Sequence, residues 1–499
     1  MYDAIIFTEN TNEIQISIPL GGFKVASVLR KHGYSVLVVN HLSTFSLEEL
    51  KTLIDLSVSD ITILVGFSTT FLQSIEENVN MGMDTVFPQG KAFEDEVISY
   101  IKEKNHAIKF AVGGTKASPV YVNTNIDYVF MGYSEISIVN LMNHLTTGSH
   151  LSFSHVNENG ITIVDDRKAA TYNFTTDRMV WGNLDVGNHK VLPLEIGRGC
   201  IFKCKFCSFP LNGKKKLDYI KEADLIHDEL LENFVKFGVR HYIIVDDTFN
   251  DHILKLKAIE SVVKKLPFEP IFWCYTRLDL LCSYPEMIDV MYNIGVRAMY
   301  FGIETLDITA GKIIGKGYDR VKQISMIEHI RYRYPDMSMH GSFIAGLPTE
   351  SLSSIKQTLS QLENGDIPLN SWMVRPFILF KDDAYTFNSD LDVNYKNYGY
   401  EVTGQNGNML LWKNEHTNIQ EAFELTTECI NVSRTKEHFY VPGHDSIELV
   451  NFGHDFYTTS KTAFKDFRWD ILKDHKVSDF IDEYKTRLFK ELNAQVVEW

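Results

Sequence analysis

The stretch GRGCIFKCKFCSFP, residues 197–210, contains half of the six cysteines of this 499-residue chain. Cys200, Cys204 and Cys207 follow a C-x3-C-x2-C spacing, directly after the apolar run LPLEIG at 192–197. Thiolates bind soft metals, and an odd number of ligands in one short loop leaves a coordination position open. No further Cys or His stands at matching spacing. The pattern therefore predicts a metal or iron–sulfur site that keeps one position for another molecule.

Strand and helix patterns alternate from this loop onward. Amphipathic or helical stretches separate six apolar runs, which are 192–197, 240–247, 270–277, 296–305, 337–346 and 371–380. Strands that alternate with helices favour parallel pairing. Six such units predict a partial (β/α)6 barrel rather than a full eight-unit one, with its chemistry at the carboxyl ends of the strands.

The first 146 residues show the same alternation. Apolar runs at 4–8, 35–40, 61–68, 107–114 and 126–132 predict strands, each ending near small or polar residues. We expect a Rossmann-like, doubly wound parallel sheet whose ligand lies beyond the carboxyl ends of its strands. The candidates there are Thr69, Thr70, Gly113 and Gly114. A tight turn at the glycines and local backbone hydrogen bonds from the threonines are the structural alternatives.

Four segments follow from these patterns. We predict a Rossmann-like domain at 1–146, a linker at 147–190 with one hairpin around Asn159-Gly160, a barrel at 191–380, and an α-rich C-terminal segment at 381–499.

The composition and charge of the chain limit which compartment and which partners we expect. The net charge of −16 makes nucleic acid an unlikely partner, because a sequence-independent footprint needs clustered Lys and Arg. No apolar run reaches the roughly 18 residues of a membrane helix, and the start MYDAIIFTEN lacks the basic region of a signal peptide. Few cysteines in a long chain exclude a secreted disulfide scaffold. We expect a cytoplasmic protein without membrane contact.

The cysteine loop resembles the signature of the radical S-adenosylmethionine (SAM) superfamily, with Phe206 as the aromatic before the last cysteine. The resemblance implies a four-iron four-sulfur cluster on Cys200, Cys204 and Cys207, with SAM on the fourth iron and its adenine beside the backbone of Phe206. Further stretches are similar to the subgroup that carries an N-terminal cobalamin-binding domain. They are VDDTF (245–249), FGIETLD (301–307), FIAGLPTES (343–351), GFSTTF (66–71), VGG (112–114) and MGYSE (131–135).

The chain departs from that subgroup in two places. No Asp-x-His-x-x-Gly motif supplies a histidine for cobalt, and Tyr133-Ser134 stands where the subgroup more often has Glu-Gly. Bound cobalamin and a vestigial domain both remain open. Methylthio-transferring relatives hold a second cluster with N-terminal cysteines, whereas residues 1–199 contain none, which argues against that activity.

Polar residues at the ends of three predicted barrel strands are the candidates for holding SAM. We expect Asp247 to accept from its ammonium group, Arg277 to pair with its carboxylate and Glu304 to bind its ribose hydroxyls. The structural alternatives are that Asp246 and Asp247 cap the next helix and that Arg277 pairs with Glu304. If cobalamin is present, Thr69, Thr70, Gly113 and Gly114 would contact it.

The sequence leaves three functions open. The first is cobalamin-dependent methylation of an unactivated carbon, and the second is a radical SAM rearrangement, cyclisation or oxidation without methyl transfer. The third is a non-catalytic metal-binding interaction protein. A small molecule or peptide is the expected substrate, read by Trp372, Arg375, Trp412 and the stretch 439–468, and a flavodoxin or ferredoxin the expected reductant.

Overall fold

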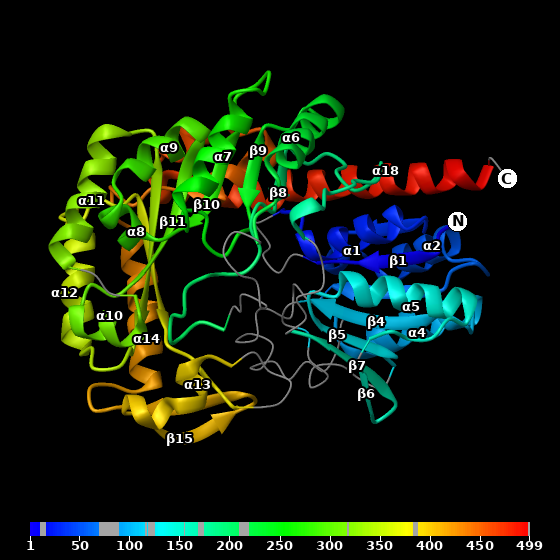
Figure 1. Ribbon diagram of the computed structural model, residues 1–499, viewed down its shortest axis with the longest axis horizontal. Coiled ribbons are helices and arrows are strands. Elements are labelled where there is room, and N and C mark those ends of the chain that lie inside the picture. The colour runs from blue at the N-terminus through cyan, green and yellow to red at the C-terminus, as the bar shows by residue number, and fades with distance from the viewer. Residues whose placement is uncertain are drawn as a thin grey trace.

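A computed structural model of the chain describes residues 1–9, 16–68, 89–114, 117, 125–153, 155–167, 174–208, 219–316, 319–382 and 388–497. Two parallel sheets dominate it, one from the N-terminal third and one from the middle of the chain (Figure 1). The α/β class expected from the sequence is confirmed.

The N-terminal sheet has seven strands in the order β2-β1-β3-β4-β5-β7-β6. Strands β1 to β5 pair in parallel, as the buried apolar runs predict. They are β1 Ala4–Phe7, β2 Val36–Val39, β3 Leu64–Ser68, β4 Lys109–Gly114 and β5 Tyr128–Gly132. Helices cover both faces: α1 Leu20–Lys31, α2 Leu47–Ser57, α4 Lys91–Lys104 and α5 Glu135–Thr147. The strand order 2-1-3-4-5 has its switch point between β1 and β3, where such sheets bind ligands.

The expected hairpin at Asn159-Gly160 is present but belongs to this sheet. Strands β6 His155–Glu158 and β7 Ile161–Asp166 pair antiparallel, and β7 continues the sheet beside β5. Asn159 and Gly160 have φ values of 50° and 84°, as a tight hairpin turn requires. The sheet therefore extends into the segment that we expected to be a linker, because its buried positions Ile161 and Ile163 complete the apolar face. The remaining domain limits stay predictions.

The second sheet contains six parallel strands in chain order, β8-β9-β10-β11-β12-β13. They are β8 Val191–Leu194, β9 His241–Ile244, β10 Ile271–Thr276, β11 Val296–Glu304, β12 Ser338–Ala345 and β13 Ser371–Pro376. Their helices are α6 Ala223–Phe237, α7 Ile253–Val263, α8 Leu278–Ser283, α9 Glu286–Ile294, α10 Ile308–Ile314, α11 Arg320–Arg333 and α12 Leu352–Glu363. These strands match the six expected units and form an open, partial barrel.

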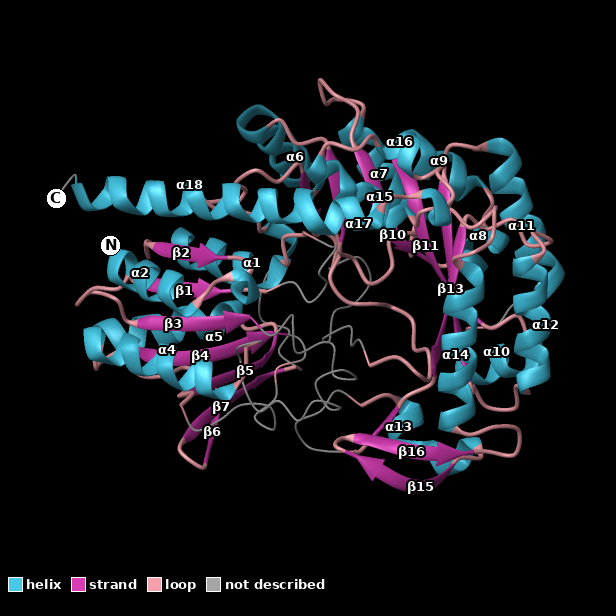
Figure 2. Ribbon diagram, turned by 180° about the vertical axis from the view of Figure 1, so that it is seen from behind, coloured by secondary structure: helices cyan, strands magenta, loops and turns pink. Residues whose placement is uncertain are grey.

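The C-terminal part is mainly helical, as expected, and also contains a small antiparallel sheet. The strands are β14 Leu379–Phe380, β15 Glu401–Asn406 and β16 Met409–Lys413. The α-helices are α13 Asp390–Asn394, α14 Ile419–Ser433, α15 Gly443–Glu448, α16 Phe456–Thr459, α17 Trp469–Ile471 and α18 Val477–Val497. Helix α14 packs against β13 at the edge of the barrel sheet (Figure 2).

Helix α18 returns to the N-terminal sheet, as both ribbon views show. Its Tyr484, Leu488 and Leu492 join the apolar core on the α2 side of that sheet. The hydroxyl of Tyr484 accepts from the backbone N–H of Asn40 at 2.8 Å. Helix α18 therefore packs the C-terminal part of the chain against the N-terminal sheet.

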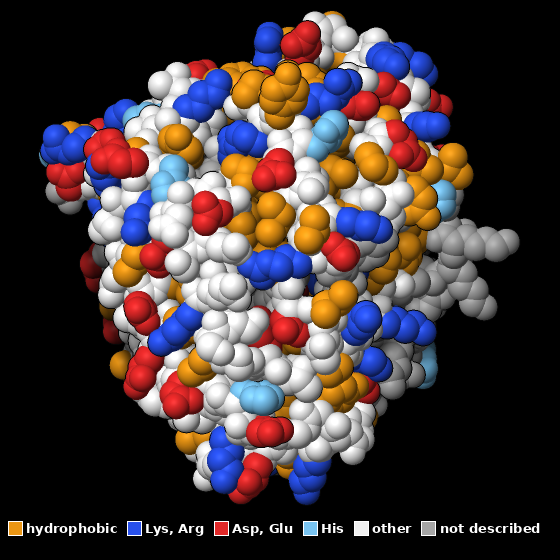
Figure 3. Space-filling model, turned by 90° about the vertical axis from the view of Figure 1, so that its left-hand side faces the viewer, with side chains coloured by type: hydrophobic (Ala, Val, Ile, Leu, Met, Phe, Trp, Pro, Cys, Tyr) orange, Lys and Arg blue, Asp and Glu red, His pale blue; other side chains and the backbone are white. Residues whose placement is uncertain are grey.

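The outer surface carries mixed side chains on the face that Figure 3 draws. Within the described residues, no helix combines the length and apolarity that a bilayer span requires. Figure 3 shows the face at the left of Figure 1, where acidic, basic and apolar side chains are interspersed. On this face, among the side chains drawn in colour, neither charge sign forms a continuous field.

Candidate active site

The cysteine loop begins directly behind β8 and is held in place on both sides. Gly199 has a φ of 83°, a left-handed conformation that turns the chain into the loop. The N–H of Lys205 donates to Ile314 O at 2.9 Å, and Lys205 O accepts from Leu391 N at 2.8 Å. The loop is thereby fixed to α10 and α13 from two directions.

Cys200, Cys204 and Cys207 line one cavity of about 220 Å³ at the carboxyl end of the barrel strands. The sequence predicted this convergence, and the cavity is also lined by residues of β10 and β11 and of the loops that follow β9, β10 and α10. Its other lining residues are Phe206, Asp247, Thr248, Tyr275, Thr276, Arg277, Tyr300, Gly302, Glu304 and Lys316. Phe206, Asp247, Arg277 and Glu304, all named from the sequence, therefore belong to a single site.

The three thiols lie around the cavity and not around one point. Among the described residues, no three Cys, His, Asp or Glu side chains converge in the way that a single ion requires. A four-iron cluster binds each of three thiolates at a different iron, so its ligands surround a volume. Burial raises the pKa of Cys200, whose Sγ lies 3.5 Å from the hydroxyl of Thr248. The other cysteines, Cys274, Cys282 and Cys429, are outside the cavity lining, as expected.

Asp247 and Asp246 have different environments at the end of β9. Asp246 accepts from Ile196 N at 2.8 Å and pairs with Lys255 at 2.8 Å, both within the protein interior. Asp247 lines the cavity and accepts from the N–H of Gly199. Burial, and then the negative charge of Asp246, raises the pKa of Asp247 to about 6. Asp247 therefore faces the cavity as a weakly acidic carboxyl group.

The expected structural alternative for this pair of aspartates is wrong. The N-cap of α7 is His252, whose ring accepts from Leu254 N at 3.1 Å. Asp246 and Asp247 lie several residues before the helix, because β9 ends well before α7 begins. Asp246 instead pairs with Lys255, and Asp247 accepts from Gly199 in the cysteine loop.

Arg277 stands at the end of β10, beside the cluster loop. Its Nε and Nη2 donate to the two carboxylate oxygens of Asp279 at 3.0 and 2.6 Å. Its Nη1 lies 3.1 Å from Cys204 Sγ. The expected ion pair between Arg277 and Glu304 is wrong, because Asp279, two residues away, takes the bidentate position.

Glu304 pairs with Lys316 across the cavity wall, Oε1 to Nζ at 2.9 Å. A register shift between β11 and β12 at Gly302 and Glu304, with a φ of 66° at Glu304, turns its side chain. A Cβ at Gly302 would lie 2.6 Å from both ion-pair atoms, so a side chain there would have to displace the ends of Glu304 and Lys316. Lys316 Nζ also lies 5.8 Å from the centre of the Phe206 ring. A carboxylate and an ammonium group therefore stand beside the aromatic of the cysteine motif.

The carboxyl ends of the N-terminal parallel strands point toward the barrel (Figures 1 and 2). Gly113 and Gly114 end β4, and Gly132 ends β5 with a φ of 95°. Ser68 ends β3. This edge presents backbone and small side chains. Thr69 and Thr70, the other candidates at this edge, lie outside the described residues.

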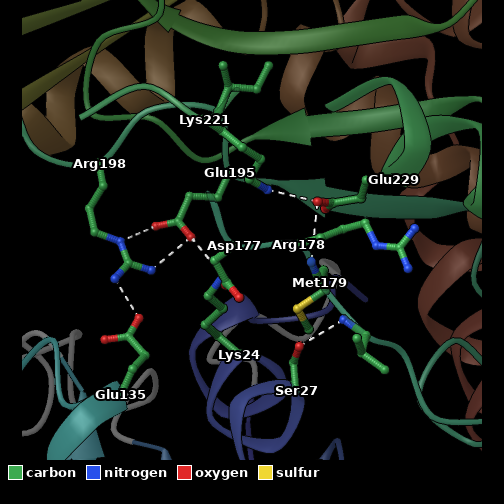
Figure 4. A network of polar contacts seen from close by, with 12 residues as sticks. Lys24, Ser27, Glu135, Asp177, Arg178, Met179, Glu195, Arg198, Lys221 and Glu229 are labelled. Carbon is green, nitrogen blue, oxygen red and sulfur yellow. Dashed lines mark hydrogen bonds and ion pairs between the residues drawn. The ribbon is translucent and has the colours of Figure 1, made fainter. Parts of the chain in front are cut away.

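A buried network of charges connects this N-terminal sheet to the cysteine loop (Figure 4). Arg198 donates to Glu135, the first residue of α5, at 2.5 Å and to both oxygens of Glu195 at 2.6 and 2.9 Å. Its guanidinium carbon lies 4.4 Å from the centre of the Tyr133 ring. Lys24 of α1 pairs with Asp177 and approaches Glu195 at 3.9 Å. The two motifs GRGC and MGYSE thus meet in space.

Several site residues were not found from the sequence. Tyr300 lies on the same face of β11 as Gly302 and Glu304, so the period-two pattern of this strand could have identified it. Tyr275 of β10 and Lys316 are further lining residues. The prediction that Trp372 and Trp412 contact the substrate is wrong, because both side chains are buried, with 2% and 0% exposure. Trp372 stacks on His438 and meets Phe439 edge to face, whereas Arg375 is exposed.

Comparison with known proteins assigns the middle of the chain to a family. The family model described as the Radical SAM superfamily matches residues 194–362. These residues form a radical SAM domain. Its solved neighbours include the radical SAM methyltransferase TsrM from Kitasatospora setae with cobalamin and a [4Fe-4S] cluster bound, with a TM-score of 0.62, 13% identity and 100% of each chain covered. Another is the cobalamin-dependent SAM radical enzyme OxsB with aqua-cobalamin and SAM bound, with a TM-score of 0.59, 14% identity, and 100% of this chain and 80% of that one covered.

Curated relatives match over shorter stretches. The ribosomal protein uS12 methylthiotransferase RimO of Thermodesulfovibrio yellowstonii is 23% identical over 273 residues, 52% of this chain and 61% of the relative. An uncharacterized methyltransferase of Synechocystis sp. is 26% identical over 221 residues, 43% of this chain and 39% of the relative. The chain thus spans less than two thirds of these relatives, and at these identities their activities are not transferred.

The residues of the radical SAM site fit the groups that the superfamily uses. Three thiols open into one cavity beside a guanidinium group, which suits a cluster. Asp247 and Glu304 can accept from ammonium and hydroxyl groups, and Lys316 and Arg277 can donate to a carboxylate. The cavity therefore offers matching partners for the amino, carboxylate and ribose groups of SAM.

Proposed function

We propose that this radical SAM protein is a cobalamin-dependent methyltransferase that methylates an unactivated carbon. The observation that supports this proposal most is the contact that Arg198 makes between the cysteine loop and the N-terminal sheet domain. The cysteine loop and the carboxyl edge of a 2-1-3-4-5 sheet are fixed against each other through Arg198 and Glu135. The edge has the glycines that a flat macrocycle could approach, and it points toward the barrel.

When bound, the reduced cluster and SAM supply a 5′-deoxyadenosyl radical, and cobalamin supplies a transferable methyl group. The chain's own residues orient these groups. Cys200, Cys204 and Cys207 would hold the cluster, and Asp247 in its ionised form would accept from the SAM ammonium group. The Glu304–Lys316 pair would face the ribose and carboxylate. Tyr275 and Tyr300, with ring centres 5.1 Å apart, line the cavity and limit water in it.

On the N-terminal sheet, Gly113 and Gly114 are our candidates for contact with cobalamin. Thr69 and Thr70 keep the same proposed role. A methylthiotransferase activity like that of RimO is disfavoured, because residues 1–199 contain no cysteine for a second cluster. The proposed setting is the cytoplasm, with a flavodoxin or ferredoxin as electron donor and a small molecule or peptide as substrate.

A second candidate keeps the radical chemistry without methyl transfer, giving a rearrangement, cyclisation or oxidation. It is favoured by the missing Asp-x-His-x-x-Gly motif, whose histidine would ligate cobalt. The solved neighbours named above favour the first candidate through their fold alone.

The first experiment is metal analysis of protein purified without oxygen from cells supplied with hydroxocobalamin. About four irons and one cobalt per chain, with methyl-deuterated SAM giving deuterated methylcobalamin, would support methyl transfer. Four irons without cobalt, even after reconstitution, would contradict the methyltransferase proposal and support the second candidate. Protein that holds neither iron nor cobalt would contradict both.

A further inference from the structure

Arg277 has a position toward the cluster loop that SAM binding alone does not explain. It is 6% exposed and follows β10 directly, and its Nη1 lies 3.1 Å from Cys204 Sγ. This is the distance of a charge-assisted hydrogen bond to a sulfur atom. Cys200, by contrast, faces the neutral hydroxyl of Thr248 at 3.5 Å.

Three contacts fix this orientation without any cofactor. Asp279 holds the other edge of the guanidinium in a bidentate pair at 3.0 and 2.6 Å. The guanidinium carbon lies 4.1 Å from the ring centre of Phe202, which belongs to the cysteine loop itself. Asn250 accepts from Arg277 N and donates to Arg277 O, both at 2.9 Å. The side chain is therefore preorganised between β10 and the loop.

The charge of this group is permanent. The ion pair with Asp279 raises the pKa of Arg277, even though burial acts in the opposite direction. A hydrogen bond from a cation withdraws electron density from a cluster thiolate. The reduced cluster carries one more negative charge than the oxidised one, so it gains more from this donor.

We propose that Arg277 is a positioning residue that raises the reduction potential of the cluster through its hydrogen bond to Cys204. This inference rests on the assignment of the cluster to the three cysteines. Reduction adds one electron from an external low-potential donor, such as a flavodoxin, and neither forms nor breaks a covalent bond. Arg277 makes this transfer easier before SAM takes part.

The test is a redox titration of anaerobically reconstituted full-length protein without SAM, followed by the electron paramagnetic resonance signal of the reduced cluster. Iron and sulfide per chain are measured first. Arg277→Gln removes the charge and one donor, and Arg277→Lys keeps the charge but loses the planar fork. Arg333→Gln is the matched control, because Arg333 also pairs with an aspartate, Asp289, but is exposed on α11.

We expect the midpoint potential to be shifted to more negative values in Arg277→Gln, by less in Arg277→Lys, and not in Arg333→Gln. Pulsed resonance in heavy water should lose one exchangeable deuteron coupling in Arg277→Gln. Equal potentials in the wild type and in either cluster-loaded Arg277 variant would overturn the inference. If Arg277→Gln loads no cluster, Arg277→Lys carries the comparison. A wild type without a reducible cluster would instead refute the assignment of the cysteines.

Discussion

Arg198 donates to Glu135 across 63 positions of sequence and, with its other nitrogens, to Glu195 at 2.6 and 2.9 Å. One residue separates Arg198 from Cys200, and Glu135 is the first residue of α5, shortly after the end of β5. A cation between two carboxylates thus sets the distance between the cluster loop and the glycine-rich edge of the N-terminal sheet. In a protein that must bring two cofactors together, such a contact would control geometry as well as stability.

Replacing Arg198 by alanine should destabilise the protein strongly. The change removes the guanidinium from the buried carboxylate of Glu135 and from that of Glu195, and removing one partner of a buried pair costs about 3–5 kcal/mol. We expect a lower midpoint of urea unfolding, measured by circular dichroism. Arg333→Ala, which removes an exposed pair with Asp289, should change stability by less than about 1 kcal/mol. Equal midpoints for the two variants would show that the buried network carries no stability.

Removing the cluster ligands gives a prediction with an internal control. Single Cys→Ala changes at Cys200, Cys204 or Cys207 should reduce iron after reconstitution from about four per chain to near zero. Cys274→Ala should keep the iron content, because Cys274 lies buried within β10 and outside the cavity lining. Iron and sulfide assays on anaerobic protein make the comparison. Full iron loading of the Cys204→Ala protein would exclude the proposed ligand set.

How far the sequence predicted the site depends on the kind of contact. Local patterns sufficed for the cysteine loop, the six barrel strands and the strand-end residues Asp247 and Glu304, because spacing and periodicity express local geometry. The partners of these residues could not be predicted in the same way. Arg277 pairs with Asp279, two residues later in the chain, and not with Glu304 as expected. A pairing through such a short turn leaves no periodic pattern in the sequence.

Contacts between segments that are far apart in the sequence could not be predicted either. Arg198 and Glu135 each lie in a recognised motif, but only the fold shows that the two motifs touch. Trp372 and Trp412 were expected to contact the substrate, at the barrel mouth and in the C-terminal segment. In the structure Trp412 instead packs where Gly346 has no side chain, with a Cβ there 2.3 Å from the indole ring. Burial of this kind depends on the C-terminal part, whose pattern was the least informative.

A side chain at Gly302 should displace the ion pair that faces the cavity. A Cβ at this position would lie 2.6 Å from Glu304 Oε1 and from Lys316 Nζ, so with alanine the ends of both side chains must move. We expect SAM binding to weaken by about tenfold or more, which corresponds to about 1.4 kcal/mol, with unchanged iron content. Equilibrium dialysis with labelled SAM measures the change. Gly66→Ala is the control, since its Cβ would meet only an ordinary contact at 3.7 Å from Ile6.

Asp247 should make SAM binding depend on pH. Burial and the negative charges of Asp246 and Glu195 raise its pKa to about 6, while Lys255 and the N–H of Gly199 act in the opposite direction. Below this value the carboxyl group is protonated in the free protein and cannot attract an ammonium group as an anion. Ionisation costs the folded state free energy, so the contribution to stability is present below the ordinary value of 3.8 and is lost as the pH rises toward 6. A bound cation would compensate for that loss.

We therefore expect the affinity for SAM to fall by about tenfold for each pH unit below the pKa of Asp247, and to level off above it. Dialysis between about pH 5 and 8, with cluster content checked at each point, measures this profile. Asp247→Asn should bind SAM more weakly at neutral pH and lose the dependence. Because Asn keeps the acceptor oxygen for the N–H of Gly199, the loop should stay in place and the iron content should not change. An unchanged profile in Asp247→Asn would assign the titration to another group and remove Asp247 from the SAM site.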